Sequence, residues 1–103
     1  MEDDETYIRG LIEIVLFTEP GECVNHPEFG MGLNEYVFMP GTPETMDALE
    51  STVQGALNRW LANVIRVDDV QAAAEESAIR VTIRYVVRRS GQCKCDEFSL
   101  HFK

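Results

Sequence analysis

The residues of this sequence that could do hydrolytic chemistry are three carboxylates of one loop, Glu19, Glu22 and Glu28. Glycoside hydrolysis requires two carboxyl groups that flank one bond, one of them with a raised pKa. The chain carries 18 acidic residues, so close pairs of carboxylates arise by chance. A domain of this size also leaves little room for a saccharide cleft, which takes roughly several hundred Å³. We therefore expect these residues to solvate the loop or to cap its backbone, and we predict no catalytic residue.

Thiols and imidazoles are the second group with potential chemistry. They could be imagined as a zinc site of Cys23, His26, Cys93, Cys95 and His101. Structural zinc sites use cysteines separated by two to four residues, and a Cys-x-Cys pair on a strand does not fit that spacing. The odd number of cysteines also differs from a disulfide framework, so we expect reduced thiols. The sequence contains no nucleophile elbow and no phosphate-binding loop, and it predicts neither a metal nor a cofactor.

A stripe of arginines is the most informative charged feature. Arg80, Arg84 and Arg88 alternate along one predicted strand, and Arg89 follows at the turn. These side chains either belong to a solvated sheet face that is balanced by acids such as Glu97, or they form a docking face. Arginine is enriched at protein interfaces, and a local basic cluster in an acidic chain favours an acidic partner surface.

The last predicted strand offers a second candidate surface. We expect residues 93–102 to lie at a sheet edge, with Cys95, Glu97, Ser99 and His101 facing outward. An uncovered edge exposes unpaired backbone groups, which another chain can complete by adding a strand. The polar residues could instead protect the edge against aggregation. Together with Arg80, Arg84 and Arg88, these four residues form the hypothesised partner-binding surface.

Size and charge restrict the class of protein. The chain has 103 residues and a formal net charge of −9, which is enough for one domain and argues against general binding to nucleic acid. No apolar run approaches the roughly 20 residues of a membrane helix, and acidic residues 2–5 precede the first apolar segment where a signal peptide is basic. We expect a single domain over residues 1–103 with a flexible acidic N-terminus at 1–6. We also expect a cytoplasmic start, from which release would need a route such as cell lysis.

Two helices are predicted in the first part of the chain. Apolar residues at helical spacing begin at Ile8 and continue to Leu16, and Pro20-Gly21 ends the segment. Residues 34–38 predict a short turn or helix, with Phe38 entering the core. Thr42-Pro43-Glu44 is a typical helix start, and the apolar face that follows runs to Trp60, with the helix ending at about residues 62–63.

From Ile65 onward the apolar period changes to two, which is typical of strands. Ile65 and Val67 are out of phase with Val70, which indicates either a β-bulge at residues 68–69 or the end of the strand there. Two further strands follow, with inward-facing residues at Ile79, Val81, Ile83, Tyr85, Val87, Phe98, Leu100 and Phe102. The predicted fold class is α+β: two amphipathic helices packed on a three-stranded antiparallel meander.

The loop between the helices has a composition that defines its shape. Proline fixes φ, while glycine reaches φ values that are closed to other residues. Long loops without regular structure are usually functional or disordered, and Pro27, Phe29 and Gly30 favour function here. We expect Phe29 to be buried as an anchor and Gly30 to adopt a conformation that disfavours a Cβ.

These motifs, in their order, resemble the gpW-type baseplate wedge family of contractile phage tails, type VI secretion systems and extracellular contractile injection systems. The resemblance covers roughly residues 8–102. It rests on Thr-x-x-Gly-Glu at 18–22, Pro-x-Phe-Gly-x-Gly-Leu at 27–33, Val-Phe at 37–38, and the segments 56–60, 65–70 and 79–87. The resemblance implies that the signature loop of the family consists of Gly21, Glu22, Pro27, Phe29 and Gly30. It also implies that Trp60 lies at the end of the second helix.

The resemblance implies a structural protein, present in six copies, at the junction of baseplate and sheath. Its implied partners are other wedge proteins, the sheath protein, and tube or hub proteins, with neither nucleic acid nor membrane. The chain departs from the family where Cys23 replaces an expected arginine and where Leu61-Ala62-Asn63-Val64 replaces a Glu-Pro-Arg motif. The pattern from Arg59 to Val67 is closest to the extracellular injection particles. The alternatives are a small peptidoglycan-cleaving enzyme and a free-standing cytoplasmic adaptor.

Overall fold

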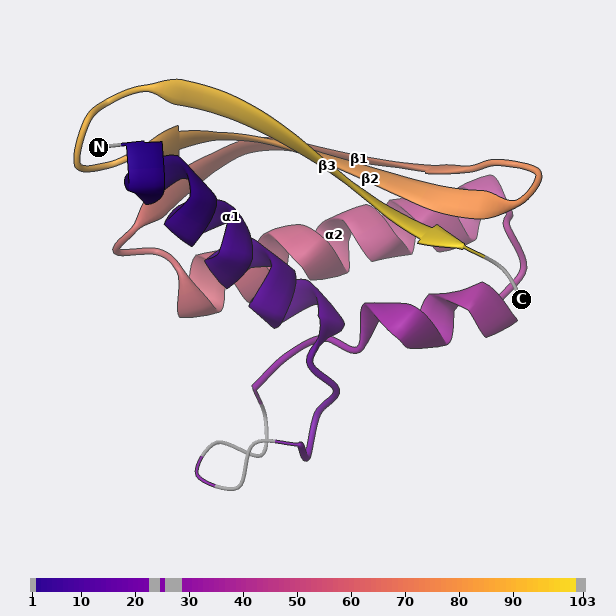
Figure 1. Ribbon diagram of the computed structural model, residues 1–103. Helices are drawn as coiled ribbons and strands as arrows, with labels where there is room; N and C mark the ends of the chain where they lie inside the picture. The colour runs from indigo at the N-terminus through magenta and orange to yellow at the C-terminus, as the bar shows by residue number, and fades with distance from the viewer. Residues whose placement is uncertain (1, 23–24, 26–28, 102–103) are drawn as a thin grey trace.

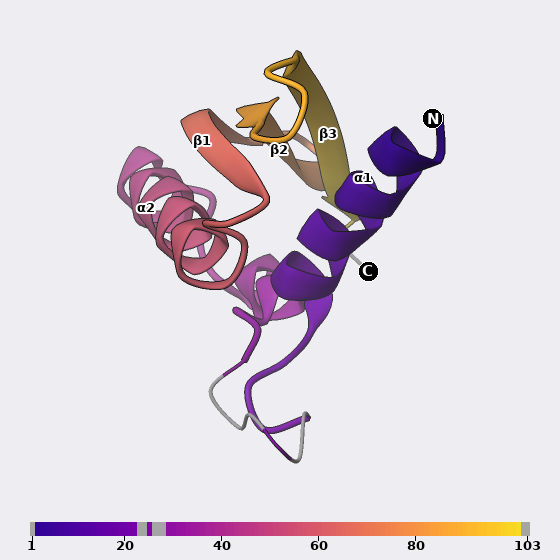
Figure 2. The same ribbon diagram turned by 90° about the vertical axis from the view of Figure 1, so that its left-hand side faces the viewer.

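A computed structural model of the chain describes residues 2–22, 25 and 29–101. Its elements lie in two layers, with the sheet on one side and the helices on the other (Figures 1 and 2). In chain order they are α1 (Glu2–Phe17), the 3-10 helix η1 (Leu33–Phe38), α2 (Pro43–Trp60), β1 (Ile65–Ala74), β2 (Ala78–Val87) and β3 (Cys93–His101). The predicted α+β class is confirmed.

Helix α1 buries one apolar stripe, as its sequence predicts. Ile12, Val15 and Leu16 are almost fully enclosed, and Ile8 is buried at the start of the same stripe. The helix begins at Glu2, earlier than the apolar pattern indicates. Acidic residues in the first turn are favoured there by the helix dipole. The flexibility expected for residues 1–6 stays a prediction, although the backbone is helical from Glu2.

Helix α2 begins as the sequence predicts. The Thr42 hydroxyl accepts a hydrogen bond from the Thr45 N–H at 3.2 Å, and Pro43 occupies the first helical turn. The helix ends at Trp60, slightly earlier than expected. The Leu61 N–H still bonds to the Leu57 carbonyl, but Leu61 itself leaves helical geometry.

The short helix η1 is also confirmed, but the expectation that Phe38 enters the core is wrong. Phe38 is 86% exposed. In a 3-10 helix residues three apart share a face, and here Leu33 and Tyr36 take the inward positions. Phe38 lies two residues beyond Tyr36 and therefore points to solvent.

The three strands form an antiparallel sheet in the order β1-β2-β3, so β1 and β3 are its two edges. The pairing of β1 with β2 shifts between Val67 and Asp69, which confirms the predicted bulge. Along β2 the buried and exposed positions alternate as expected, and the inward residues of β3, Phe98 and Leu100, complete the core. Phe102 lies outside the described residues.

Candidate functional site: a loop junction and two sheet edges

The signature loop and the end of helix α2 meet in one aromatic contact. The rings of Phe29 and Trp60 lie edge to face, with centroids 4.9 Å apart and an interplanar angle of 69°. The Arg59 guanidinium also lies over the Trp60 ring, 4.8 Å from its centroid. Phe29 is half-buried, less than the burial that the sequence analysis expects. It still anchors the loop, because it packs against the hydrophobic core.

Gly30 has the conformation that the sequence predicts. Its φ is 94°, and a Cβ built on it would lie 2.2 Å from the Thr18 carbonyl oxygen. The loop passes this close because the Gly32 N–H donates to that same carbonyl at 3.0 Å, and the Met31 N–H donates to Val15 at 3.1 Å. Gly30 therefore lets the returning chain lie against the end of α1.

The first part of the loop forms a local turn. The Glu22 carboxylate accepts a hydrogen bond from the Glu19 N–H at 2.6 Å, and the Glu22 N–H donates to the Glu19 carbonyl at 3.0 Å. Gly21 lies between them with φ 97°. Glu22 thus caps the backbone of its own turn. Pro27, Glu28 and Cys23 lie outside the described residues.

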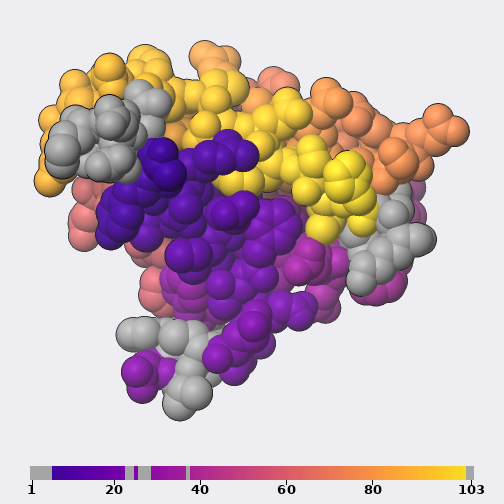
Figure 3. Space-filling model, viewed as in Figure 1, coloured from indigo at the N-terminus to yellow at the C-terminus, as the bar shows by residue number. Residues whose placement is uncertain are grey.

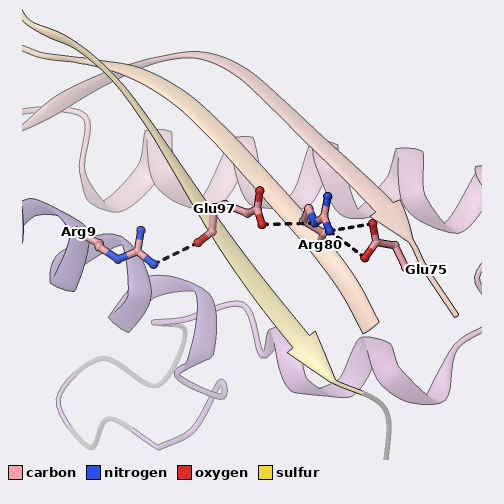
Figure 4. A network of polar contacts seen from close by, with 4 residues as sticks. All are labelled: Arg9, Glu75, Arg80 and Glu97. Atoms are coloured by element: carbon pink, nitrogen blue, oxygen red, sulfur yellow. Dashed lines mark hydrogen bonds and ion pairs between the residues drawn. The ribbon is translucent and has the colours of Figure 1, made fainter. Parts of the chain in front are cut away.

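The arginine stripe is divided by its ion pairs. Arg80 contacts Glu75 at 3.0 Å and Glu97 at 3.3 Å (Figure 4). Arg88 turns toward the connection between α2 and β1, where its Nε donates to the Ala62 carbonyl. Arg84 is exposed and stands across from Asp69 and Cys95 in the sheet. Among the described side chains, none forms an ion pair with Arg84.

The edge of β3 lies where the sequence predicts it, and Arg9 of α1 reaches it. The Arg9 Nη2 donates to the Glu97 carbonyl at 3.1 Å, and its Nη1 lies 3.4 Å from the Asp96 carboxylate. The guanidinium also lies 4.5 Å from the centre of the Phe98 ring. The Glu97 carbonyl therefore faces away from β2.

Alternate residues of an antiparallel strand present their backbone groups on the same side. Ser99 and His101 must then direct their N–H and C=O groups to the same free side as Glu97. The side chains of Cys95, Glu97, Ser99 and His101 are all exposed, as expected. Helix η1 also contacts β3, but among the described residues none forms a hydrogen bond with the outward backbone groups of Ser99 or His101.

The opposite edge of the sheet is occupied by a helix. The Ala72 N–H of β1 donates to the Glu50 carboxylate of α2 at 2.8 Å, and α2 packs along β1. Sequence reasoning found neither Glu50 nor Arg9. The signal for Arg9 was present, because it is the one basic residue among the acidic and apolar residues of α1.

Over residues 2–22, 25 and 29–101, no cluster of three His, Cys, Asp or Glu side chains could hold a metal ion. Cys93 and Cys95 are exposed free thiols on β3, and His101 is exposed near its end. Within the same part of the chain, no helix is both long and apolar enough to span a membrane.

Comparison with known proteins gives a matching family and a similar solved structure. Residues 2–92 match the family described as baseplate wedge protein gp25. A crystal structure of a Geobacter sulfurreducens protein, which carries the name tail lysozyme, is similar with a TM-score of 0.83 and 29% identity. The alignment covers 96% of this chain and 91% of that one. Among curated proteins, none matches this chain.

Proposed function

Because this chain belongs to the family of baseplate wedge protein gp25, we propose that it joins the baseplate of a contractile tail-like particle to the first layer of its sheath. Family membership indicates a structural role in a tail baseplate. The observation that supports the finer role is the edge of β3, where the Glu97 carbonyl faces away from β2 and Ser99 and His101 follow on the same side. An edge of this kind can accept a strand from another chain.

The exposed face of the sheet supplies the charge for this attachment. Arg84 stands next to Cys95 on the outer face, and the described residues leave it without an ion pair. Backbone pairing gives affinity, while Arg84 favours an acidic partner strand and fixes its register. Arg80 contributes less to the partner because Glu75 and Glu97 already neutralise it.

The loop junction is the proposed contact with a neighbouring wedge protein. Phe29 and Trp60 are both half-buried, so part of each side chain reaches the surface of the molecule. The described part of this loop lies on the side of the molecule away from the sheet (Figures 1 and 2). A wedge partner and a sheath strand can therefore be held at the same time. The proposal further includes six copies of the chain per particle and contacts with tube or hub proteins. It also includes that the particle is an extracellular contractile injection system.

The name of the similar Geobacter protein raises a second candidate, a peptidoglycan hydrolase. A glycosidase acid needs a desolvated setting and a second carboxylate across the scissile bond. Glu22 is exposed and already caps the Glu19 N–H. We therefore favour a structural protein over an enzyme. Peptidoglycan turnover by the purified chain that disappears in Glu22→Gln would overturn that preference.

The sheath role is tested by a proline on the edge of β3. Ser99→Pro removes an N–H on the free side of the strand and leaves the ladder to β2 intact, whereas Ser99→Ala keeps the N–H. We expect Ser99→Pro chains to fold, to enter baseplates and to yield few sheathed particles by electron microscopy. Ser99→Ala should assemble normally. Normal sheathing with a folded Ser99→Pro chain would reject strand addition at this edge.

A further inference from the structure

Helix α1 has a second apolar row that its own fold does not use. Tyr7 is 66% exposed and Ile14 is 53% exposed, although the opposite face of the helix is buried in the core. The two residues are seven apart, and Gly10 lies between them, so the three share one side of the helix. Figure 3 shows α1 at the surface of the molecule, below β3. We call Tyr7, Gly10 and Ile14 the outer row.

Gly10 has no role inside the fold that requires glycine. A Cβ built on it meets nothing within 4 Å, and no positive φ is found there. Glycine in a helix interior costs about 1 kcal/mol relative to alanine. A missing side chain between two exposed apolar side chains leaves a notch, which allows another backbone to approach the helix closely.

Gly55 of α2 provides the comparison. It too lies inside a helix, and a Cβ there also meets nothing within 4 Å. Its exposed neighbours on the helix surface are polar, namely Ser51, Thr52, Asn58 and Arg59. Only Gly10, of these two helical glycines, is therefore flanked by large exposed apolar residues.

The charge of α1 indicates what could cover the outer row. The helix contains one basic residue, Arg9, which is already held by Asp96 and the Glu97 carbonyl. Its acidic residues are Glu2, Asp3, Asp4, Glu5 and Glu13. A second copy of this chain would also carry a net charge of −9 and would be repelled. A partner with lysine or arginine beside its apolar residues would be attracted instead.

We propose that the outer row of α1 binds a basic amphipathic helix of another protein. A helix suits the surface because α1 offers no free backbone edge to a strand, and apolar residues at helical spacing fit a helix laid alongside. This surface is separate from the β3 edge, so the proposal does not depend on strand addition by a sheath protein. The Ser99→Pro chain should therefore bind the basic helix as the parent chain does.

The test uses the full chain and a synthetic helical peptide as the probe. The peptide carries leucine and alanine on one face and lysine beside them; a matched peptide has glutamate in place of each lysine. We expect the lysine peptide to bind the parent chain in calorimetry and the glutamate peptide to bind at least about tenfold more weakly. Gly10→Gln and Ile14→Gln should each weaken binding of the lysine peptide about tenfold.

Gly55→Gln is the matched control, because it adds the same side chain to a helix position where a Cβ likewise meets nothing within 4 Å. It should leave peptide affinity unchanged, as should Ser99→Pro. Circular dichroism checks that each variant is folded. The proposal is overturned if the lysine peptide fails to bind the parent chain, or if Gly10→Gln binds it as tightly as Gly55→Gln does. It is equally overturned if the parent chain dimerises in solution and Ile14→Gln abolishes the dimer, since a second copy would then be the occupant.

Discussion

The Arg9 side chain donates to the backbone carbonyl of Glu97, 88 residues further along the chain, at 3.1 Å. This bond connects the first helix to the edge of the last strand. It satisfies one outward carbonyl of that edge and places a positive charge beside it, next to Asp96. Charged side chains at a sheet edge are a common protection against unwanted pairing between sheets. Arg9 therefore both holds α1 to the sheet and limits access to β3.

The first prediction follows from this double role. Arg9→Met keeps a long apolar side chain and removes the charge and all donors. We expect a loss of about 1 kcal/mol in the free energy of unfolding, because the group is about half exposed. We also expect more self-association through the uncapped edge, measured by light scattering during size-exclusion chromatography.

Arg66→Met is the control for Arg9→Met. Arg66 pairs with Asp68 at 3.1 Å on β1, so its removal also deletes an exposed ion pair. It does not touch the β3 edge. Equal self-association of the two variants would show that net charge, rather than capping of Glu97, limits association between copies of the chain.

The second prediction concerns the return of the loop at Gly30. Gly30→Ala would bring a Cβ to 2.2 Å from the Thr18 carbonyl oxygen at a φ of 94°. We expect a loss of about 3 kcal/mol or more in the free energy of unfolding, from backbone strain together with the clash. Urea denaturation measures it.

Gly21→Ala separates strain from clash. Gly21 has a similar φ of 97°, but a Cβ there meets nothing within 4 Å. We expect only about 1–2 kcal/mol of destabilisation, from the strain alone. If the two alanine variants melt alike, the loop relaxes away from Thr18 without cost and Gly30 is not needed for close approach.

Local patterns in the sequence were sufficient for the secondary structure. The phase change between Val67 and Val70 located the bulge, and Thr42-Pro43 located the start of α2, because both signals act over a few residues. Phe38 was misplaced because the apolar pattern does not distinguish a 3-10 turn from an α-helical one.

Contacts between distant segments were not predictable in the same way. Phe29 and Trp60 were each singled out by family resemblance, yet nothing in the sequence joined the two rings. The caps of the two sheet edges, Arg9 and Glu50, depend on how the helices cross the sheet. The sequence also did not show which arginines of the stripe form ion pairs, because Glu75 reaches Arg80 across the hairpin between β1 and β2.

The last prediction uses the difference in ion pairing between Arg80 and Arg84. Arg84→Gln and Arg80→Gln each remove one positive charge from the outer face of β2. Arg80 is already neutralised by Glu75 and Glu97, whereas Arg84 is exposed without an ion pair among the described residues. We therefore expect Arg84→Gln to weaken binding of the particle's sheath protein about fivefold at low salt, which corresponds to about 1 kcal/mol. Arg80→Gln should weaken it less.

Salt dependence decides whether this effect is electrostatic. Raising the salt from about 50 mM to about 300 mM shortens the range of charge interactions, so the difference between Arg84→Gln and the parent chain should shrink. Biolayer interferometry at both concentrations provides the measurement, and the unfolding midpoint of each variant shows that the fold is kept. Equal losses for Arg84→Gln and Arg80→Gln would mean that the partner responds to the total charge of the face. A loss for Arg84→Gln that persists unchanged at high salt would instead point to direct packing of its side chain, and the choice of an acidic partner strand would have to be abandoned.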